Sequence, residues 1–397
     1  MADAVTIMES RPPRRAAPLR LGLIGLGTVA QAVHLPLLAK LRDVFLTAAV
    51  CDLSGATCEA IGERFAIPAA RRYRSPEALL EDEDLDAVAI LSSGSHGGLA
   101  EAAARRGLAV FCEKPLAYTV AEADALAALE PRLMLAYMKL YDPAVERAGA
   151  LLRDRPAPRS IEVTVLHPPS ESQLAHVGLL PHAEDVEPDR LERLRSDEAA
   201  LVERALGDVP AELGLLYTDV LLGSVVHDLA VIRYLLGSPL ELEYADRWDT
   251  SVALAGRLGG GARVSIRWHY LENYPAYREE VEVHDADGTI SVTFPAPYLL
   301  HAPAVLRVVD DPGDGSEHVS ETRSTVEAFE RQWLAFADFA AGRAAPRAGI
   351  TEGREDIAVC QRAAALLAAR AGIEIGGEAA TFRTIDERAE NGKGGAR

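Results

Sequence analysis

The sequence has only four cysteines, Cys51, Cys58, Cys112 and Cys360, and no two of them have CxxC spacing. This pattern argues against a disulfide framework and favours reduced, buried thiols in a cytoplasmic protein. Positive charge is also scarce, because 41 Lys and Arg stand against 60 Asp and Glu, which gives a formal net charge of −19. Such a surface repels nucleic acid phosphates and anionic lipid. We therefore expect neither nucleic acid nor a membrane as a partner.

Long uninterrupted hydrophobic runs are absent as well. The most apolar long segment, residues 213–237, contains Asp219, His227, Asp228 and Arg233, whose side chains are costly in hydrocarbon. Aromatic residues make up 6% of a chain that is 49% hydrophobic and 25% charged, a composition typical of a folded globular protein. No cluster of His, Cys and carboxylates has the spacing of a metal site. We predict no membrane span and no bound metal.

The length of 397 residues fits two domains of moderate size. Up to residue 142, short apolar runs alternate with helical patterns, which is typical of parallel strands joined by crossover helices. Longer alternating segments follow, which indicate a different sheet. We predict an α/β Rossmann domain over residues 19–142 and an α+β domain with a large, mostly antiparallel open sheet over residues 143–384. Residues 1–18 and 385–397 are expected to be flexible tails.

The second domain is expected to hold six strands and two C-terminal helices. We place the strands at residues 160–166, 240–248, 251–258, 262–270, 279–284 and 289–294, and the helices at residues 325–341 and 357–371. The charged segment 167–213 is rich in Pro and Glu, and we interpret it as an insertion or lid. Since the exposed face of an antiparallel sheet usually needs a partner, we expect a homodimer or homotetramer.

The turn GLGTVA, residues 25–30, follows an apolar strand and opens a helix. In that context Gly25 permits a tight bend, Gly27 lets the backbone approach a pyrophosphate, and Ala30 allows close packing of helix and strand. The helix N-terminus then presents free N–H groups and a positive dipole end to the phosphates. A plain turn between strand and helix is the alternative. The residues predicted to contact a dinucleotide here are Gly25, Gly27, Thr28, Val29 and Ala30.

Asp52 ends the second apolar run. At that position a carboxylate can accept hydrogen bonds from the ribose hydroxyls of NAD and repel the 2′-phosphate of NADP. A solvated loop aspartate is the alternative, and basic residues farther along, such as Arg64, leave NADP open. We predict NAD as the cofactor, with NADP less favoured.

Glu113-Lys114-Pro115 follows another apolar strand, at the sheet edge where doubly wound folds place their ligands. The Lys114 amine can donate to a substrate oxygen and stabilise the negative charge that develops there during hydride transfer. An inert, exposed lysine is the alternative. By its position alone, Lys114 is a candidate catalytic residue and no more.

Several segments together resemble one family of oxidoreductases. They are GLIGLGTVAQAVHLPLL, CDLS, SSGSHGGLAEAAARRGLAVFCEKPLA, MLAYMKLYDPAVERA, GSVVHDLAVIRYLLG and EGREDIAVCQRAAALLAA. This chain resembles the glucose-fructose oxidoreductase, inositol dehydrogenase and rhizopine catabolism family over nearly its whole length. The resemblance implies a pyridine-nucleotide oxidoreductase that acts on a sugar, a cyclitol or a related polyol, with the substrate between the two domains.

The resemblance also implies roles for single residues. Lys114 lies beside the nicotinamide, and His227 is the catalytic acid or base, a task that suits a side chain with an unperturbed pKa near neutrality. A packed histidine on an apolar helix is the alternative for His227. Further cofactor contacts are expected at Ser92, Ser93, His96 and Glu113. Substrate contacts are expected at Lys114, Tyr137, Lys139, Asp142, His227 and Asp228, with structural support as the alternative for the residues from Tyr137 to Asp142.

One departure from the family concerns the partner of His227. An aspartate commonly stands one helical turn before this histidine, and here that position is Gly223; a second common aspartate is replaced by Ala230. No obvious carboxylate in the helix is then placed to orient the imidazole.

The sequence therefore predicts an NAD-dependent oxidoreductase that moves a hydride between nicotinamide and a secondary alcohol or ketone of a sugar-like substrate. Two alternatives remain open. One is redox-assisted bond cleavage or epimerisation with recycled NAD, and the other is an NAD-binding sensor or regulatory protein that has lost catalysis.

Overall fold

The computed structural model of the protein describes residues 17–181, 183–237 and 239–382. The expected tail at residues 385–397, and all of the expected tail at 1–18 except its last two residues, lie outside the described residues.

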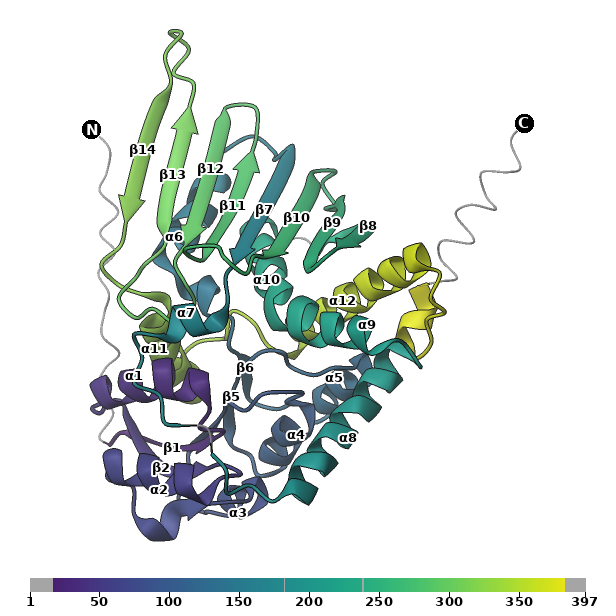
Figure 1. Ribbon diagram of the computed structural model, residues 1–397. Coiled ribbons are helices and arrows are strands. Elements are labelled where there is room, and N and C mark those ends of the chain that lie inside the picture. The colour runs from purple at the N-terminus through teal and green to yellow at the C-terminus, as the bar shows by residue number, and fades with distance from the viewer. Residues whose placement is uncertain (1–16, 182, 238, 383–397) are drawn as a thin grey trace.

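The first sheet is the Rossmann sheet that the N-terminal pattern predicts (Figure 1). Its strands are all parallel and run in the order β3-β2-β1-β4-β5-β6. Their bounds are β1 Leu19–Ile24, β2 Phe45–Cys51, β3 Arg72–Tyr73, β4 Ala87–Ile90, β5 Ala109–Cys112 and β6 Leu133–Leu135. Every residue of β4 and β5 is buried, because helices cover both faces. The order reverses between β1 and β4, and ligands bind beyond the carboxyl ends of the strands at such a point.

Short helices connect these strands or follow the last of them. They are η1 Ala30–His34, α1 Leu35–Lys40, α2 Gly55–Arg64, η2 Ala69–Arg71, α3 Pro76–Leu80, α4 Gly97–Arg105, α5 Val120–Ala127 and η3 Met138–Tyr141. Three of them begin with side-chain caps that the sequence encodes locally, and at α3 the cap is Ser75, whose hydroxyl accepts from the Ala78 backbone. The Ser54 hydroxyl accepts from the Thr57 backbone at the start of α2, and Thr119 forms a capping box with Glu122 at the start of α5.

The second sheet has eight strands in the order β14-β13-β12-β11-β7-β10-β9-β8. Only β7 and β10 pair in parallel, which confirms a large, mostly antiparallel sheet. The bounds are β7 Ser160–His167, β8 Glu241–Trp248, β9 Ser251–Arg257, β10 Arg263–Tyr270, β11 Arg278–His284, β12 Gly288–Phe294, β13 Val305–Asp310 and β14 His318–Arg323.

The expected six strands are present, but β13 and β14 were not predicted. Strand β14 lies at the sheet edge and is exposed along nearly its whole length, so its sequence HVSETR lacks the alternation of a half-buried strand.

The helices that follow the first domain are α6 Pro143–Leu152, α7 Ser170–Leu174, α8 Pro188–Leu206, α9 Ala211–Leu215, η4 Leu216–Val225, α10 Val226–Leu236, α11 Ala328–Ala340, α12 Ile350–Ala371 and η5 Glu378–Phe382. Helix α12 begins at Ile350 instead of 357, because Glu352 accepts from the Gly349 backbone N–H and starts the helix earlier. Helix α11 packs on the first sheet, where the Trp333 ring stacks on Phe111 with 4.2 Å between centroids.

The continuous helical stretch Ala211–Leu236 has the length and apolar composition that would suffice to cross a membrane. It is the one such stretch within the described ranges, and 61% of its most apolar window is buried inside the protein. It also carries His227 on the wall of the cleft described next.

Candidate active site

The described residues enclose a large cleft beyond the carboxyl ends of the first sheet's strands. Its volume is about 1950 Å³, well above the roughly 300–1,000 Å³ of a typical pocket for one small molecule. The lining comes from the loops after β1, β2, β4 and β5, from α8, from η4 and α10, and from β7 and β10 of the second sheet. The cleft has room for a dinucleotide and a second ligand. Within residues 17–181, 183–237 and 239–382, no group of three or more His, Cys, Asp or Glu is placed to hold a metal ion.

The glycine turn forms one end of this cleft, with Gly25, Gly27, Thr28 and Val29 on its surface. Gly25 has φ of +91°, and a Cβ there would lie 2.4 Å from the Ser92 backbone nitrogen, so only glycine fits. A Cβ on Gly27 would meet no atom within 4 Å. The space beside Gly27 is therefore open for a ligand that approaches the backbone, as a pyrophosphate does. Ala30 is fully buried and is not part of the lining.

We expect Gly27→Val to fold normally and to lose NADH binding by at least about tenfold. The added side chain meets no protein atom near its Cβ, but it projects into the space that a pyrophosphate requires. Thermal unfolding and a fluorescence titration with NADH measure the two quantities separately. Unchanged NADH affinity would place the dinucleotide elsewhere.

The Asp52 carboxylate lies next to this turn and lines the cleft. Its Oδ2 accepts from the Leu26 backbone N–H at 2.8 Å, and its Oδ1 accepts from the Ser54 backbone N–H at 3.0 Å. These contacts hold the carboxylate against the glycine turn. Each oxygen retains a second lone pair, so the position suits an acceptor for ribose hydroxyls.

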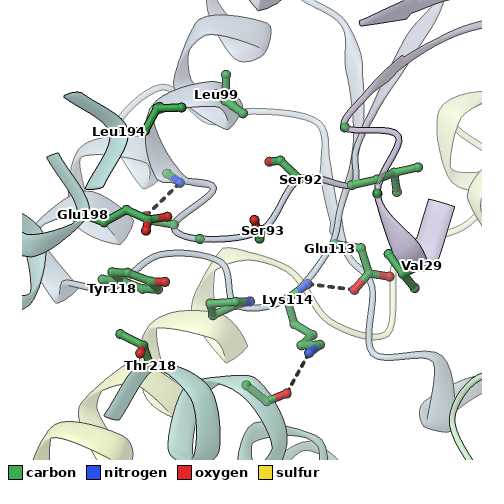
Figure 2. Close-up of a pocket in the computed structure, with 18 of the residues that line it drawn as sticks. Val29, Ser92, Ser93, Leu99, Glu113, Lys114, Tyr118, Leu194, Glu198 and Thr218 are labelled. Atoms are coloured by element: carbon green, nitrogen blue, oxygen red, sulfur yellow. Dashed lines mark hydrogen bonds between the residues drawn. The ribbon is translucent and has the colours of Figure 1, made fainter. Parts of the chain in front are cut away.

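The loop after β4 contributes Ser92 and Ser93 to the cleft (Figure 2). Ser92 Oγ is buried and has no hydrogen-bond partner among the described residues. His96, which the resemblance placed near the nicotinamide, is instead fully buried and outside the lining. Its Nδ1 lies 2.5 Å from the Pro115 carbonyl oxygen and its Nε2 lies 2.7 Å from the Ser92 carbonyl oxygen. It therefore connects the loops after β4 and β5.

Glu113 and Lys114 leave the carboxyl end of β5 in different directions. Glu113 lines the cleft, and its Oε1 lies 3.2 Å from His34 Nε2. Burial alone would raise the pKa of Glu113, but the contact with His34 and the nearby Lys114 amine outweigh it and lower the pKa. The Lys114 side chain extends toward the second domain (Figure 2). Its pKa is lowered, first by burial and then by Lys139, against the opposing effect of Glu113.

The Lys114 amine donates to the Gly223 carbonyl oxygen at 2.7 Å. Gly223 is the position at which the family commonly has an aspartate, and it lies in the π-helical stretch η4. A backbone oxygen thus contacts the lysine at the place of the missing carboxylate. This contact ties the loop after β5 to the helix that carries His227.

His227 lies in the first turn of α10 and lines the cleft. Its Nδ1 is buried and has no hydrogen-bond partner among the described residues, and its ring packs edge-on to Tyr137 with 5.9 Å between centroids. Burial, followed by the positive charges of Lys139 and Lys114, holds the pKa of His227 well below the usual 6.5. The imidazole is neutral at neutral pH and can accept a proton.

Near His227, Lys139, Asp228, Glu279 and Tyr277 form a cluster of charged and polar groups. The Lys139 amine is 2.5 Å from both Glu279 oxygens, and the Tyr277 hydroxyl donates to Glu279 Oε2 at 2.5 Å. Burial and the neighbouring Glu279 raise the pKa of Asp228 well above its usual value. Asp228 therefore keeps its proton, and Lys139 pairs with Glu279. Lys139 reaches the cleft surface, whereas Asp228 does not.

We expect Asp228→Asn to become more stable relative to wild type as the pH rises. Asp228 holds its proton in the folded protein and loses it in the unfolded chain, so its stabilising effect is present at low pH and is lost as the pH rises through the folded pKa. Asparagine does not titrate. Melting temperatures measured between about pH 5 and about pH 9 give the difference between the variant and the wild type. A difference that stays constant or falls with pH would contradict this protonation state.

Tyr137 and Asp142, expected at the substrate, both lie outside the cleft lining. The Tyr137 hydroxyl donates to Asp356 Oδ2 at 2.7 Å, and Asp356 also pairs with Arg233. Asp142 accepts from the Ala144 backbone at 2.8 Å as the N-cap of α6, and from the Ala304 backbone at 3.2 Å. The Tyr137 hydroxyl and the Asp142 carboxylate are thus hydrogen-bonded within the protein, so both residues have a structural role outside the cleft.

An aromatic wall of the cleft beside the second sheet was not predicted from the sequence. Trp268 and Tyr270 are two positions apart on β10, so both side chains lie on the face of the strand that lines the cleft. Tyr270 pairs in register with His167 of β7. The Trp268 indole N–H donates to Ser224 Oγ at 2.9 Å, which fixes the ring. The other aromatic residues that line the cleft are Tyr118, Tyr277, Tyr298 and Phe329. The alternation of apolar and polar residues in β10 predicts a strand, but it does not reveal which face of that strand meets a ligand.

The first domain of this chain is similar in sequence to known oxidoreductases. Residues 19–140 match the model of the oxidoreductase family with an NAD-binding Rossmann fold. A D-apiose dehydrogenase of Paraburkholderia graminis is 39% identical over 27% of this chain and 29% of its own length. An NADP-dependent D-xylose 1-dehydrogenase of Haloferax volcanii is 39% identical over 32% of this chain and 40% of its own length. The matched segment thus spans less than half the length of these curated relatives.

Solved structures match over both sheets. One is a scyllo-inositol dehydrogenase of Lactobacillus casei with bound NAD(H) and scyllo-inositol, at a TM-score of 0.64 and 16% identity, covering 89% of this chain and 98% of that one. At that identity the likeness concerns the fold, and it extends the match through the second sheet. Residues 19–140 are thus similar to the glucose-fructose oxidoreductase, inositol dehydrogenase and rhizopine catabolism family of oxidoreductases, and the rest of the chain shares the fold of these solved structures.

Proposed function

We propose that this protein is an NAD-dependent dehydrogenase or ketoreductase that interconverts a secondary alcohol and a ketone on a sugar, cyclitol or related polyol. The observation that carries the proposal is the cleft itself. Lys114 and His227 line it beside the second sheet, and the glycine turn and Asp52 line it beside the first. The names of the relatives, dehydrogenases of apiose and xylose, support the substrate class.

The cofactor would lie along the first sheet's edge, with its pyrophosphate at Gly27 and its ribose hydroxyls at Asp52. When bound, nicotinamide accepts or returns a hydride at C4. The open space at Gly27 and the free lone pairs of Asp52 fit a dinucleotide. The carboxylate of Asp52 favours NAD over NADP, because it would repel a 2′-phosphate.

Lys114 and His227 divide the polar chemistry at the reacting carbon. The Lys114 ammonium donates to the substrate oxygen and stabilises negative charge there, and its contact with the Gly223 carbonyl orients it. Neutral His227 takes the hydroxyl proton when the alcohol is oxidised. Because its pKa is held low, protonated His227 is a stronger acid than an ordinary imidazolium and returns that proton readily when the ketone is reduced.

The substrate side favours a neutral, ring-shaped polyol. Trp268 and Tyr270 offer flat apolar surfaces to the C–H face of such a ring. Of the nearby charges, Lys139 pairs with Glu279, and the Lys114 amine contacts the Gly223 carbonyl oxygen.

A turnover screen tests this proposal. The protein is mixed with NAD and a panel of sugars and inositols, and with NADH and the corresponding keto compounds, while absorbance of NADH is followed. A dehydrogenase accumulates NADH from one of the polyols. Product formation without net NADH would support recycled NAD, and tight NADH binding with no turnover on any compound would support a sensor.

We also propose a cytoplasmic homodimer or homotetramer. Across the second sheet, surface ion pairs such as Arg257–Glu243, Arg263–Glu243 and Arg267–Glu162 form a polar face on which a second copy could pack. All four cysteines are free and buried, in keeping with a reducing compartment. Light scattering after size-exclusion chromatography measures the mass in solution, and a monomer would contradict the assembly.

A further inference from the structure

The segment between β7 and η4, which the sequence suggests is an insertion or lid, crosses the cofactor side of the cleft. Its long helix α8 runs beside α4 (Figure 1) and supplies Arg190, Leu194 and Leu201 to the lining. A Cβ on Gly94, in the loop after β4, would lie 1.9 Å from Glu198 Oε1. The Glu198 carboxylate of α8 therefore packs directly against the backbone of this loop. A dinucleotide in this cleft would lie partly beneath α8.

The residues just before α8 attach to the start of α2 through Asp185. Asp185 Oδ1 accepts from the Ser54 hydroxyl at 2.5 Å, and its Oδ2 accepts from the Ala56 backbone N–H at 3.0 Å. The Ser54 hydrogen bond, followed by the Ala56 N–H, lowers the pKa of Asp185, which is ionised at neutral pH. A carboxylate from a distant segment thus occupies the N-terminus of a ten-residue helix.

Arg74 adds positive charge at the same place. Its Nη2 donates to the Leu53 carbonyl at 3.2 Å and to the Asp185 carbonyl at 3.4 Å. A Cβ on Gly55 would lie 3.4 Å from Asp185 Oδ2 and 3.5 Å from Arg74 Nε, so the guanidinium and the carboxylate flank the first residue of α2. A serine hydroxyl, helix N–H groups and an arginine together are a set of donors that binds phosphate.

This position adjoins the proposed ribose acceptor. Asp52 Oδ1 accepts from the Ser54 backbone N–H, and the hydroxyl of the same Ser54 donates to Asp185. Asp52 lines the cleft, whereas Ser54, Arg74 and Asp185 lie just outside its lining. A phosphate on the 2′-oxygen of a ribose held by Asp52 would extend past the cleft wall toward Ser54 and the Asp185 carboxylate. Two carboxylates would then face one phosphate.

We propose that Asp185 is a specificity-determining residue that excludes the 2′-phosphate of NADP by occupying its binding position. This inference rests on the dinucleotide site of the proposed function. Asp185 comes from the insertion and not from the Rossmann domain, so the insertion itself selects the cofactor. With Asp185 neutralised, Ser54, the α2 N-terminus and Arg74 are available to a phosphate.

Fluorescence titrations of the whole protein with NADH and NADPH test the proposal through the ratio of the two dissociation constants. In Asp185→Asn we expect NADPH to bind about tenfold more tightly relative to NADH than in the wild type, because one of two repelling charges is gone. Glu187→Gln is the matched control. It removes one negative charge two residues away, from an exposed side chain that does not cap α8, and should leave the ratio unchanged.

A second substitution identifies the phosphate's partners. In the Asp185→Asn background, Arg74→Gln removes the positive charge and should abolish the gain for NADPH. An unmoved ratio in Asp185→Asn, or an equal change for both cofactors, would overturn the role of Asp185 while leaving the dinucleotide site intact. Failure of the wild type to bind either cofactor would overturn the proposed function together with this inference.

Discussion

Lys114→Met is expected to lower kcat on the polyol identified by the screen by about 10²–10³-fold, the usual cost of removing one donor to a developing oxyanion. The side chain keeps its length and loses its charge. NADH binding should change little, because Asp52 and the glycine turn lie elsewhere in the cleft. Steady-state kinetics and an NADH titration measure the two effects.

Lys40→Met is the matched control for Lys114→Met. Lys40 lies at the end of α1, contacts Glu330 and is 48% exposed, so its loss should leave turnover unchanged. Full turnover in Lys114→Met would remove this lysine from the chemistry. A loss confined to NADH binding would make it a cofactor contact only.

His227→Asn is expected to lower kcat by about 10²–10⁴-fold, the range attributed to a positioned acid or base. Asparagine preserves a polar group of similar size but cannot transfer the proton. His284→Asn, on β11 where the ring contacts Thr289, is the control outside the cleft. Unchanged turnover in His227→Asn would require a different acid or base.

The pH profile of the wild type follows from the environment of His227. Its pKa is held well below 6.5, so the neutral base persists on acidification past the point where an ordinary histidine is protonated. The acid limb of kcat/KM for alcohol oxidation should therefore lie below pH 6.5. That limb should disappear in His227→Asn. An acid limb at or above 6.5 would contradict the effect of burial and of the two lysines.

The Rossmann domain could be predicted because its signals are local. Each apolar run is followed within a few residues by a glycine, a cap or a charged residue, as at Gly25, Asp52 and Glu113, and the alternation of strands and helices predicts a parallel sheet. Strand β14 escaped prediction because an exposed edge strand has no apolar face to alternate. Strand β13 lies inside the sheet with Leu306 and Val308 buried, and its short alternation was overlooked.

The candidate site was only partly predictable. Lys114 follows from its motif and His227 from the family resemblance, but the contact of Lys114 with the Gly223 carbonyl depends on a turn of π-helix that sequence spacing does not reveal. Tyr137 and Asp142 have the residue types of a substrate site. Their hydroxyl and carboxylate are instead bonded to Asp356 and to backbone N–H groups, which only the tertiary structure shows.

The segment between β7 and η4 stands out in the sequence by its charge, but the residues that attach it to the cofactor side of the cleft do not. Asp185 and Ser54 are 131 positions apart, and no local pattern connects them. The same holds for the aromatic wall, since Trp268 and His167 come from different strands of the second sheet. Contacts between residues so far apart in the chain cannot be predicted from a single sequence.

Isotope transfer tests the central claim most directly. The polyol identified by the screen is prepared with deuterium on the carbinol carbon and incubated with NAD and the enzyme, and the nicotinamide is then analysed by NMR. Direct hydride transfer in this cleft predicts deuterium at nicotinamide C4, with the rate of labelling lost in Lys114→Met and His227→Asn. Deuterium released to solvent, or a nicotinamide that stays unlabelled while product forms, would contradict it.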